Sequence, residues 1–343
     1  MRALRTRRLV AAAGAALAIT GLLAGCTADN TGTSSEPTNN TDNEGSGEQV
    51  VIGFSGPAAD HGWLGAINSA ALAEAAKYPD IDLRVAEGTD DANLQISQIE
   101  TFINDGVDAI VLLPTDGAAL TEVALKAMQA GIPVINVDRE FSSPFAARIT
   151  VLGDNYGMGV SAGEYICEKF GGTDAVIAEI AGIDSLPLTQ DRSAGFADSL
   201  SDCGLKVSNR VAASFTVASG EEVTSQLLAA APHIDAMWNH DDDQGIGVLA
   251  ALDAAGRDEM LMVGGAGSKN AMDAIKADDS VLKATIIYPS TQAADGIRLA
   301  RLLVQGKAMA DLVEMDVPTR VVLFAPVVTK DNVDQYMPIG FAS

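Results

Sequence analysis

The chain has 343 residues, of which 46 are acidic and 22 are basic, so its formal net charge is −24. Four of the basic residues lie in the first 25 positions, and the rest of the chain carries 18 basic against 46 acidic residues, a net charge of −28. This surplus of negative charge repels phosphate groups and excludes nucleic acid and anionic lipid as partners. The length of the chain after residue 48 predicts two domains rather than one.

The first 25 residues have the layout of a secretory signal. Four arginines, the last of them Arg8, precede an apolar run from Leu9 to Leu23 that is too short to span a membrane. The run ends in Leu23-Ala24-Gly25-Cys26, which resembles a bacterial lipobox and implies cleavage before Cys26 and lipidation of its thiol. The alternative is an exported protein in which this cysteine is fortuitous.

Residues 26–48 form a second distinct segment, made almost wholly of polar residues, glycine and proline. A segment of this composition buries too little apolar surface to offset the entropy lost on ordering, so we expect a flexible tether. Signal, lipid and tether together predict a protein that is exported and lipid-anchored to the outer face of the cell membrane.

After the tether, apolar β-prone runs alternate with stretches of helical periodicity. Strands are expected at 50–55, 82–86, 109–113, 133–137, 149–152, 175–180, 206–212, 234–238, 260–264, 282–287 and 321–328. Helices are expected at 64–77, 92–104, 118–130, 157–170, 189–202, 221–231, 245–255, 271–277 and 292–305. The alternation predicts an α/β protein with two doubly wound parallel-sheet lobes, in tandem and with a cleft between them.

Two cysteines remain in this body, Cys167 and Cys203. In an exported protein they could form a disulfide, and two buried free thiols are the alternative. The exported context favours the disulfide.

Ligands in open α/β sheets bind at the carboxyl ends of the strands. In the first half, Asp60, His61 and Trp63 follow the first expected strand, and Asp138 and Arg139 follow the fourth. An indole face, a carboxylate and a guanidinium suit the C–H groups and hydroxyls of a polyhydroxylated ligand. The alternatives are that Trp63 is a core residue and that Asp138 and Arg139 form a surface ion pair.

In the second half, polar and aromatic residues again stand near strand ends. They are Gln190 and Arg192 at a helix start, Phe215, Tyr288, and the run Asn239-His240-Asp241-Asp242-Asp243. Phe215 could instead be core, Arg192 could pair with Asp191, and Tyr288 could anchor its strand.

The order of these motifs resembles the ribose-binding-protein group of type I periplasmic binding proteins, the sugar receptors of ABC importers. The resemblance covers nearly all of residues 50–337 and rests on Ile135-Asn136-Val137-Asp138-Arg139, Gly153-Asp154-Asn155, Gln190-Asp191-Arg192 with Gly195-Phe196, and Asn239-His240-Asp241-Asp242. It implies two lobes joined by a three-crossover hinge. We expect the first lobe at 49–154 plus 289–320 and the second at 155–288 plus 321–343.

The resemblance also implies a ligand site between the lobes. Its residues would be His61, Trp63, Asp138, Arg139, Gln190, Arg192, Phe215, Asp241 and Tyr288, with Asp60, Asn239 and His240 as further candidates. The implied partners are a small polyhydroxylated ligand and an ABC permease with its ATPase. We expect a monomer without catalytic residues, metal or cofactor.

Departures from the family pattern bear on the ligand. The family's Val-Gly-Phe-Asp is here Val263-Gly264-Gly265-Ala266, which lacks the carboxylate, while Asp241 stands in place of an amide and Tyr288 in place of a glutamine. One expected arginine is Gln190. We therefore expect another pentose or a linear polyol rather than ribose.

Within the tetrad from His240 to Asp243, we expect Asp241 to contact the ligand. Asp242 and Asp243 are expected to serve the following helix as cap and first-turn charges. For His240, two roles remain open: it could line the cleft or orient a carboxylate.

Other functions are weighed against this one. The tetrad could hold a metal, although consecutive residues at a strand end point in divergent directions, whereas metal ligands must converge. A carbohydrate-active enzyme would need an acid/base pair or nucleophile, and no serine or cysteine elbow is recognisable. The export signal and the net charge exclude the related transcription factors that share this fold.

Overall fold

The computed structural model describes residues 47–309 and 316–343. The expected signal segment, Cys26 and nearly all of the tether lie outside the described residues. Among the residues that are described, no helix is both long and apolar enough to cross a membrane.

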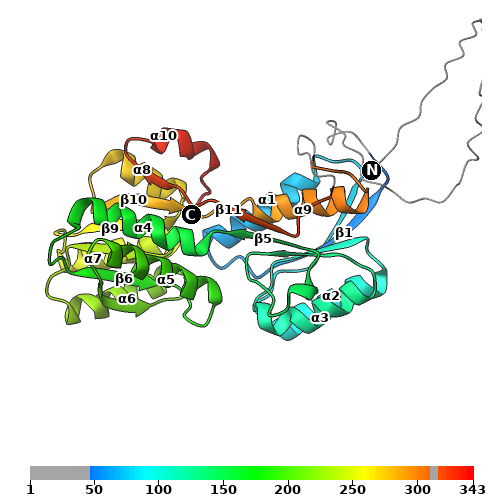
Figure 1. The fold of residues 1–343 in the computed structure, drawn as a ribbon, viewed down its shortest axis with the longest axis horizontal. Helices are drawn as coiled ribbons and strands as arrows, with labels where there is room; N and C mark the ends of the chain where they lie inside the picture. The colour runs from blue at the N-terminus through cyan, green and yellow to red at the C-terminus, as the bar shows by residue number, and fades with distance from the viewer. Residues whose placement is uncertain (1–46, 310–315) are drawn as a thin grey trace, which may run out of the picture. The chain divides into compact units, whose positions relative to one another are not determined.

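The first sheet has six strands in the order β11-β5-β4-β3-β1-β2, all parallel. Its strands are β1 (Val50–Ser55), β2 (Ile81–Val85), β3 (Ala109–Leu112), β4 (Val134–Val137), β5 (Ile149–Gly153) and β11 (Arg320–Leu323). Helices α1 (Gly62–Ala75) and α9 (Gln292–Val304) cover one face, and α2 (Ala92–Asp105) and α3 (Gly117–Gln129) cover the other (Figure 1). This sheet with its helices is called the first lobe.

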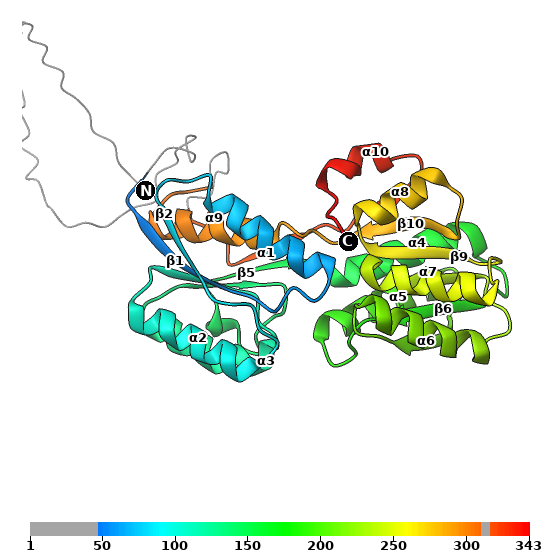
Figure 2. The same cartoon turned by 180° about the vertical axis from the view of Figure 1, so that it is seen from behind.

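The second sheet repeats this strand order as β12-β10-β9-β8-β6-β7, with only β12 antiparallel. Its strands are β6 (Ile177–Ala181), β7 (Val207–Ala212), β8 (Ala236–Asn239), β9 (Leu261–Ala266), β10 (Leu282–Ile287) and β12 (Val327–Thr329). The helices are α4 (Asn155–Phe170), α5 (Pro187–Asp202), α6 (Val217–Ala230), α7 (Asp242–Ala255), α8 (Lys269–Ala277) and α10 (Val333–Tyr336). Helix α4 packs on α5, and α6 packs on α7 (Figure 2). These elements form the second lobe.

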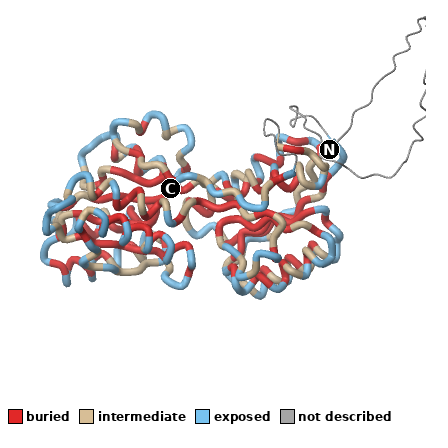
Figure 3. The backbone as a smooth tube through the Cα atoms, viewed as in Figure 1, coloured by how far each residue is buried: buried red, intermediate tan, exposed pale blue. Residues whose placement is uncertain are grey.

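Buried strands explain why the apolar runs predicted the sheets so well. Strands β3, β4 and β8 are buried along their whole length, because helices cover both faces of a parallel sheet (Figure 3). The amphipathic helices between them expose their outer faces. The α/β fold with two parallel-sheet lobes is therefore confirmed.

The chain passes between the two sheets three times: between β5 and α4, between β10 and α9, and between β11 and β12. The single strand expected at 321–328 is wrong, because the run is two strands in different sheets. Val321–Leu323 pair with β5 in the first lobe, whereas 321 was expected to open the second lobe. The break falls at Pro326, which has no N–H to donate to a sheet.

The disulfide predicted in the second lobe is present. Cys167 in α4 and Cys203 at the carboxyl end of α5 are bonded, with their Cα atoms 5.9 Å apart. The bond links the two helices that pack most extensively on one another.

Candidate functional site

The carboxyl end of β4 supplies two of the expected site residues. Asp138 has a left-handed backbone, with φ 63°, and is 4% exposed. Arg139 donates from Nη1 to the carbonyl of Thr115 at 2.7 Å, and its Nε lies 3.9 Å from the Asp138 carboxylate. A left-handed conformation is uncommon for a residue with a side chain, so the surrounding contacts must hold Asp138 in place.

Tyr288 follows β10 and meets Asp138 from the second lobe. Its hydroxyl donates to Oδ1 of Asp138 at 2.5 Å and accepts from Nδ2 of Asn155 at 3.2 Å. Its ring centroid lies 5.4 Å from that of Trp63, whose Nε1 donates to the Tyr288 carbonyl at 3.1 Å. Burial raises the pKa of Tyr288 above its ordinary value, so the hydroxyl remains a protonated donor at neutral pH.

Arg192 enters the same space from α5. It donates from Nε to Oδ1 of Asn155 at 2.9 Å and from Nη1 to the carbonyl of His240 at 3.2 Å. Its guanidinium carbon lies 4.5 Å from the Tyr288 ring centroid and 5.9 Å from that of Phe215. These contacts fix the plane of a buried guanidinium, which presents donors in a fork-shaped array.

Phe215 is the second site residue with a left-handed backbone, at φ 64°. Its N–H donates to Oε1 of Gln244 at 3.0 Å, and its ring stacks 6.2 Å from His61 of the first lobe. A Cβ at Gly182 would lie 2.0 Å from the Phe215 ring. Position 182 therefore requires glycine for Phe215 to reach the site.

The four residues that follow β8, from His240 to Asp243, contact different partners. Asp241 caps α7 by accepting from the N–H groups of Asp243 at 2.9 Å and Gln244 at 3.1 Å. The helix therefore begins at Asp242, three residues before the expected start at Gly245. Asp241 is itself the cap, a role expected of Asp242 or Asp243. Burial, together with the charge of Asp243, raises the pKa of Asp241 well above its ordinary value.

Asp242 and Asp243 turn away from one another. Asp242 accepts from the N–H groups of Gly265 at 2.9 Å, Gly267 at 2.9 Å and Ser268 at 2.7 Å. Burial nevertheless raises the pKa of Asp242 to about 7. Asp243 accepts from the N–H of Trp63 at 3.1 Å, so it contacts the first turn of α1 in the first lobe.

His240 is fully buried, and its contacts distinguish between lining the cleft and orienting a carboxylate. Its Nε2 lies 3.0 Å from Oε1 of Glu179, so it contacts a carboxylate and does not line the cleft. Burial lowers the pKa of His240 to about 4, against the opposing effect of Glu179, so the ring is neutral at pH 7. Burial would raise the pKa of Glu179, but the hydrogen bonds from His240 and Ser193 and the charge of Arg210 lower it.

These residues enclose a cavity of about 30 Å³. Eight of the nine expected ligand residues line it: His61, Trp63, Asp138, Arg139, Arg192, Phe215, Asp241 and Tyr288. Gln190 does not line it, because two helical positions separate it from Arg192 and place it on another face of α5. Gln190 is exposed and donates to the Asp184 carbonyl at 3.1 Å. Asp60 and Asn239 also lie outside this lining.

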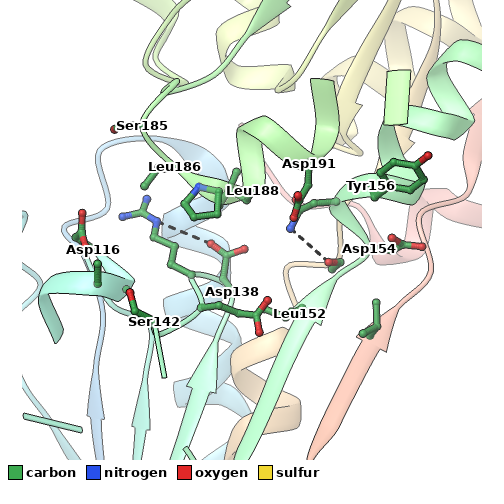
Figure 4. A pocket seen from close by; sticks show the side chains of 18 of the residues that line it. Asp116, Asp138, Ser142, Leu152, Asp154, Tyr156, Ser185, Leu186, Leu188 and Asp191 are labelled. Atoms are coloured by element: carbon green, nitrogen blue, oxygen red, sulfur yellow. Dashed lines mark hydrogen bonds and ion pairs between the residues drawn. The ribbon is translucent and has the colours of Figure 1, made fainter. Parts of the chain in front are cut away.

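A larger cavity of about 390 Å³ adjoins the first and shares Asp138, Arg139 and Leu188 with it. Figure 4 shows Asp138 at the end of its strand, together with Leu186 and Leu188 at the start of α5. Binding pockets for small ligands usually measure roughly 300–1,000 Å³. The larger cavity falls in that range, and the inner one is far smaller.

Sequence reasoning missed several contributors. Leu188 and Ala266 line the inner cavity, and Asn155 links Tyr288 to Arg192. Ala266, with φ 87°, occupies the position where the family pattern has its carboxylate. Asn155 belonged to a motif that carried the family resemblance, so its role could have been expected.

No metal site emerges from the tetrad. Within residues 47–309 and 316–343, no group of three or more His, Cys, Asp or Glu side chains is arranged to hold a metal ion. The partners described above explain this, because the four side chains diverge.

Two parallel-sheet lobes with a polar, aromatic cavity at their strand ends define a type I binding protein, and comparisons with known proteins agree. The family described as "Periplasmic binding protein domain" matches residues 52–308. The chain belongs to this family, in its ribose-binding-protein-like branch. The family consists of solute-binding proteins rather than enzymes.

Several individual relatives are named for the sugar or sugar alcohol that they bind. The ribose import binding protein RbsB of Bacillus subtilis is 30% identical over 262 residues, which cover 74% of this chain and 84% of the relative. The xylitol-binding protein of Mycolicibacterium smegmatis is 27% identical over 76% of this chain and 72% of its own length. The solved structure of an ABC transporter solute-binding protein from Bacillus halodurans with bound myo-inositol has a TM-score of 0.76 at 25% identity. That alignment covers 86% of this chain and 99% of the other.

Proposed function

We propose that the chain is the solute-binding lipoprotein of an ABC importer and binds a small sugar or sugar alcohol between its lobes. A pentose or a linear polyol is the favoured ligand. The observation that carries the proposal is that eight of the nine ligand residues expected from the sequence, drawn from both lobes, line one cavity.

The chemistry of the lining supports a polyhydroxylated ligand. Asp138 and Asp241 offer carboxyl oxygens, while Arg139 and Arg192 offer planar sets of N–H donors. Trp63 and Phe215 offer flat apolar faces for C–H groups. The relatives are named for ribose and for xylitol, which are a pentose and a pentitol.

The N-terminal sequence supports the remaining parts of the proposal. Cleavage before Cys26 and lipidation of its thiol would hold the receptor at the outer face of the cell membrane. There it would act as a monomer and deliver its ligand to a membrane permease driven by an ATPase. A Cys26→Ala variant should be released from the membrane fraction, and its continued retention would count against the lipid anchor.

Titration calorimetry against aldoses and sugar alcohols tests the ligand. We expect saturable one-to-one binding of a pentitol or a pentose, with no turnover of the bound compound. Tight binding of ribose without binding of any polyol would contradict the preferred ligand class. Absence of binding to every sugar and polyol would contradict the function itself.

A further inference from the structure

A buried carboxylate lies next to the candidate site without lining its inner cavity. Asp242, the first residue of α7, is 4% exposed, and both of its oxygens accept hydrogen bonds. Oδ1 accepts from the N–H of Gly265 at 2.9 Å, and Oδ2 accepts from the N–H groups of Gly267 at 2.9 Å and Ser268 at 2.7 Å. The Thr285 hydroxyl of β10 donates to the same carboxylate, 3.0 Å from Oδ1 and 2.9 Å from Oδ2. One side chain therefore joins α7 to the end of β9, to the start of α8 and to β10.

These bonds hold the segment that brings Ala266 to the cavity. Ala266 lines the cavity with φ 87°, and Gly267 after it has φ 80°. Two consecutive left-handed residues, one of them with a side chain, persist only where surrounding contacts hold them. The Asp242 carboxylate supplies such contacts, because it bonds the N–H groups on both sides of Ala266. The Ala266 carbonyl accepts from the N–H of Tyr288 at 3.1 Å, so the constraint extends to a second cavity residue.

The surrounding chain is built to admit this carboxylate. A Cβ at Gly264 would lie 2.4 Å from Oδ1 of Asp242, which is closer than van der Waals contact allows. Glycine at position 264 therefore lets the side chain reach β9. Asp241, and not Asp242, caps α7, so the bonds of Asp242 serve the tertiary structure and not the helix end.

The other elements meet Asp242 with uncharged donors. Lys269 at the start of α8 is exposed, and Lys283 of β10 donates to Asp278 at 2.7 Å. The charged and titratable residues on the segments around the carboxylate include Asp241, Asp243, His240, Arg192, Lys269 and Lys283. The N–H groups and the hydroxyl lower the pKa of Asp242, but burial raises it more, to about 7. Protonation would turn one acceptor oxygen into a donor that faces other donors.

We infer that Asp242 is a positioning residue for ligand binding, which holds Ala266 and Tyr288 in place through hydrogen bonds to the backbone between β9 and α8. The inference rests on the proposed function, because it concerns the same site. Asp242 acts through the segment that it holds and not by touching the ligand. Loss of its negative charge should therefore weaken binding in a protein that remains folded.

The test measures the affinity for xylitol, ribose, glucose and myo-inositol by titration calorimetry between pH 6 and pH 8. Without ligand, about nine-tenths of Asp242 should carry a proton at pH 6 and about one-tenth at pH 8, so the intact receptor should bind about tenfold more weakly at pH 6. Asp242→Asn keeps the shape of the side chain but sets an amide N–H₂ against N–H donors. Its affinity at pH 8 should be about tenfold lower than that of the intact receptor and should not vary across this pH range.

Two further variants separate positioning from stability, which is measured by thermal unfolding. Thr285→Val removes one donor and keeps the charge of Asp242, so the pKa of Asp242 rises and the fall in affinity should move to higher pH. Asp235→Asn is the matched control, because Asp235 lies before the other end of β8 and accepts from the N–H of Val176 at 2.7 Å. This control should lose stability but keep the affinity and pH profile of the intact receptor.

A folded Asp242→Asn variant that keeps the affinity or the pH profile of the intact receptor would overturn the inference and leave the proposed function supported. An equal loss of affinity in Asp235→Asn would also overturn it, because the effect would then follow from destabilisation alone. If Asp242→Asn does not fold, Thr285→Val decides: a shifted pH profile supports the positioning role, and an unchanged profile overturns it. If the intact receptor binds none of the four compounds at any pH, the proposed function fails and the inference falls with it.

Discussion

The third strands of the two sheets occupy corresponding places, yet their ends carry very different residues. Leu113 donates its N–H to Ser55 at 3.0 Å in the first lobe, and His240 donates its N–H to Ile180 at 3.0 Å in the second. The first lobe continues as Pro114-Thr115-Asp116, and the second continues as three aspartates. The same fold position therefore carries one carboxylate in one lobe and three in the other.

The difference shows how the second lobe accommodates its charge. Asp116 simply caps α3 by accepting from Ala119 at 2.9 Å, and Leu113 is buried apolar surface. In the second lobe, Asp241 caps α7 in the same way and also lines the cavity. The side chains of His240, Asp242 and Asp243 have partners on remote elements. Asp243 reaches the first lobe.

The fourth and fifth strands show the same asymmetry. Asp138 after β4 corresponds to Ala266 at the end of β9, and both have left-handed backbones and line the cavity. Gly153 of β5 corresponds to Tyr288 after β10, and these two positions pack directly against each other. The lobes thus share one backbone plan, and the site depends on the side chains that differ.

Removing the disulfide is expected to have the largest effect, because only the second lobe has one among the described residues. The bond joins residues 36 apart in sequence, and in the chain-entropy model its loss costs about 3 to 4 kcal/mol. Urea unfolding of a Cys167→Ala/Cys203→Ala variant should show this decrease in the free energy of unfolding. An unchanged unfolding midpoint would contradict the expectation.

Replacing His240 should remove a contribution to the pH dependence of stability. The corresponding residue of the first lobe, Leu113, cannot make such a contribution because it does not titrate. The folded pKa of His240 is about 4, against an ordinary value of 6.5, so the unfolded chain binds a proton more readily between these values. Relative to a variant without this histidine, the free energy of unfolding should therefore fall as the pH decreases from 6.5 to 4, by roughly 3 kcal/mol in all, whereas the raised pKa of Asp242 contributes in the opposite direction to every variant alike.

Urea denaturation across this pH window checks the His240 prediction by comparing the intact protein with His240→Gln, in which an amide can still donate to Glu179. His233→Gln is the matched control, because His233 is an exposed residue that pairs with Asp235. The difference in unfolding free energy between the intact protein and His240→Gln should change by this amount across the window, whereas the difference between the intact protein and His233→Gln should stay constant. Equal slopes in both variants would rule out His240 as the source of this change.

Arg139 has no counterpart in the second lobe, where Gly267 holds the corresponding position. Arg139→Ala should reduce ligand affinity about 100-fold, since it removes charged donors from a buried polar site. The fold should persist, because the Arg139 side chain donates only to the Thr115 carbonyl. Calorimetry with the best ligand measures the loss, and Arg84→Ala, at an exposed surface pair, is the control. Near-normal affinity would disprove the assignment of Arg139 to the site.

The smallest expected effect concerns two helix N-termini in the first lobe. Helix α2 is capped locally by Asp91, whereas α1 lacks a local side-chain cap and receives the Asp243 carboxylate from the second lobe. Asp91→Ala and Asp243→Ala should each cost about 1 kcal/mol of stability. Only Asp243→Ala should also weaken ligand binding, by a few-fold, because its contact joins the lobes. Equal affinities in both variants would show that the contact does not favour closure.

The sequence predicted most of the fold because its signals are local. Apolar runs marked nearly every strand, since strands buried on both faces need apolar residues throughout. The errors were also local. The strand expected at 321–328 is divided between sheets, and α7 starts three residues early because Asp241 accepts the first free N–H groups.

The residues of the candidate site were predicted less reliably than the fold. Strand-end position correctly selected Asp138, Arg139 and Phe215 as cavity residues. It failed for Gln190, because the helical face that points into the cavity depends on how α5 is seated.

Sequence alone therefore determined the two-lobed α/β architecture and the strand ends at which a ligand site should be sought, and it favoured the disulfide that the structure shows. Tertiary structure decided that Asp241, rather than Asp242 or Asp243, caps α7 and that the Tyr288 ring packs against Gly153. The physical reason is that these roles depend on partners from remote segments. Left-handed backbones at Asp138, Phe215 and Ala266 also turn the chain in directions that sequence periodicity does not encode.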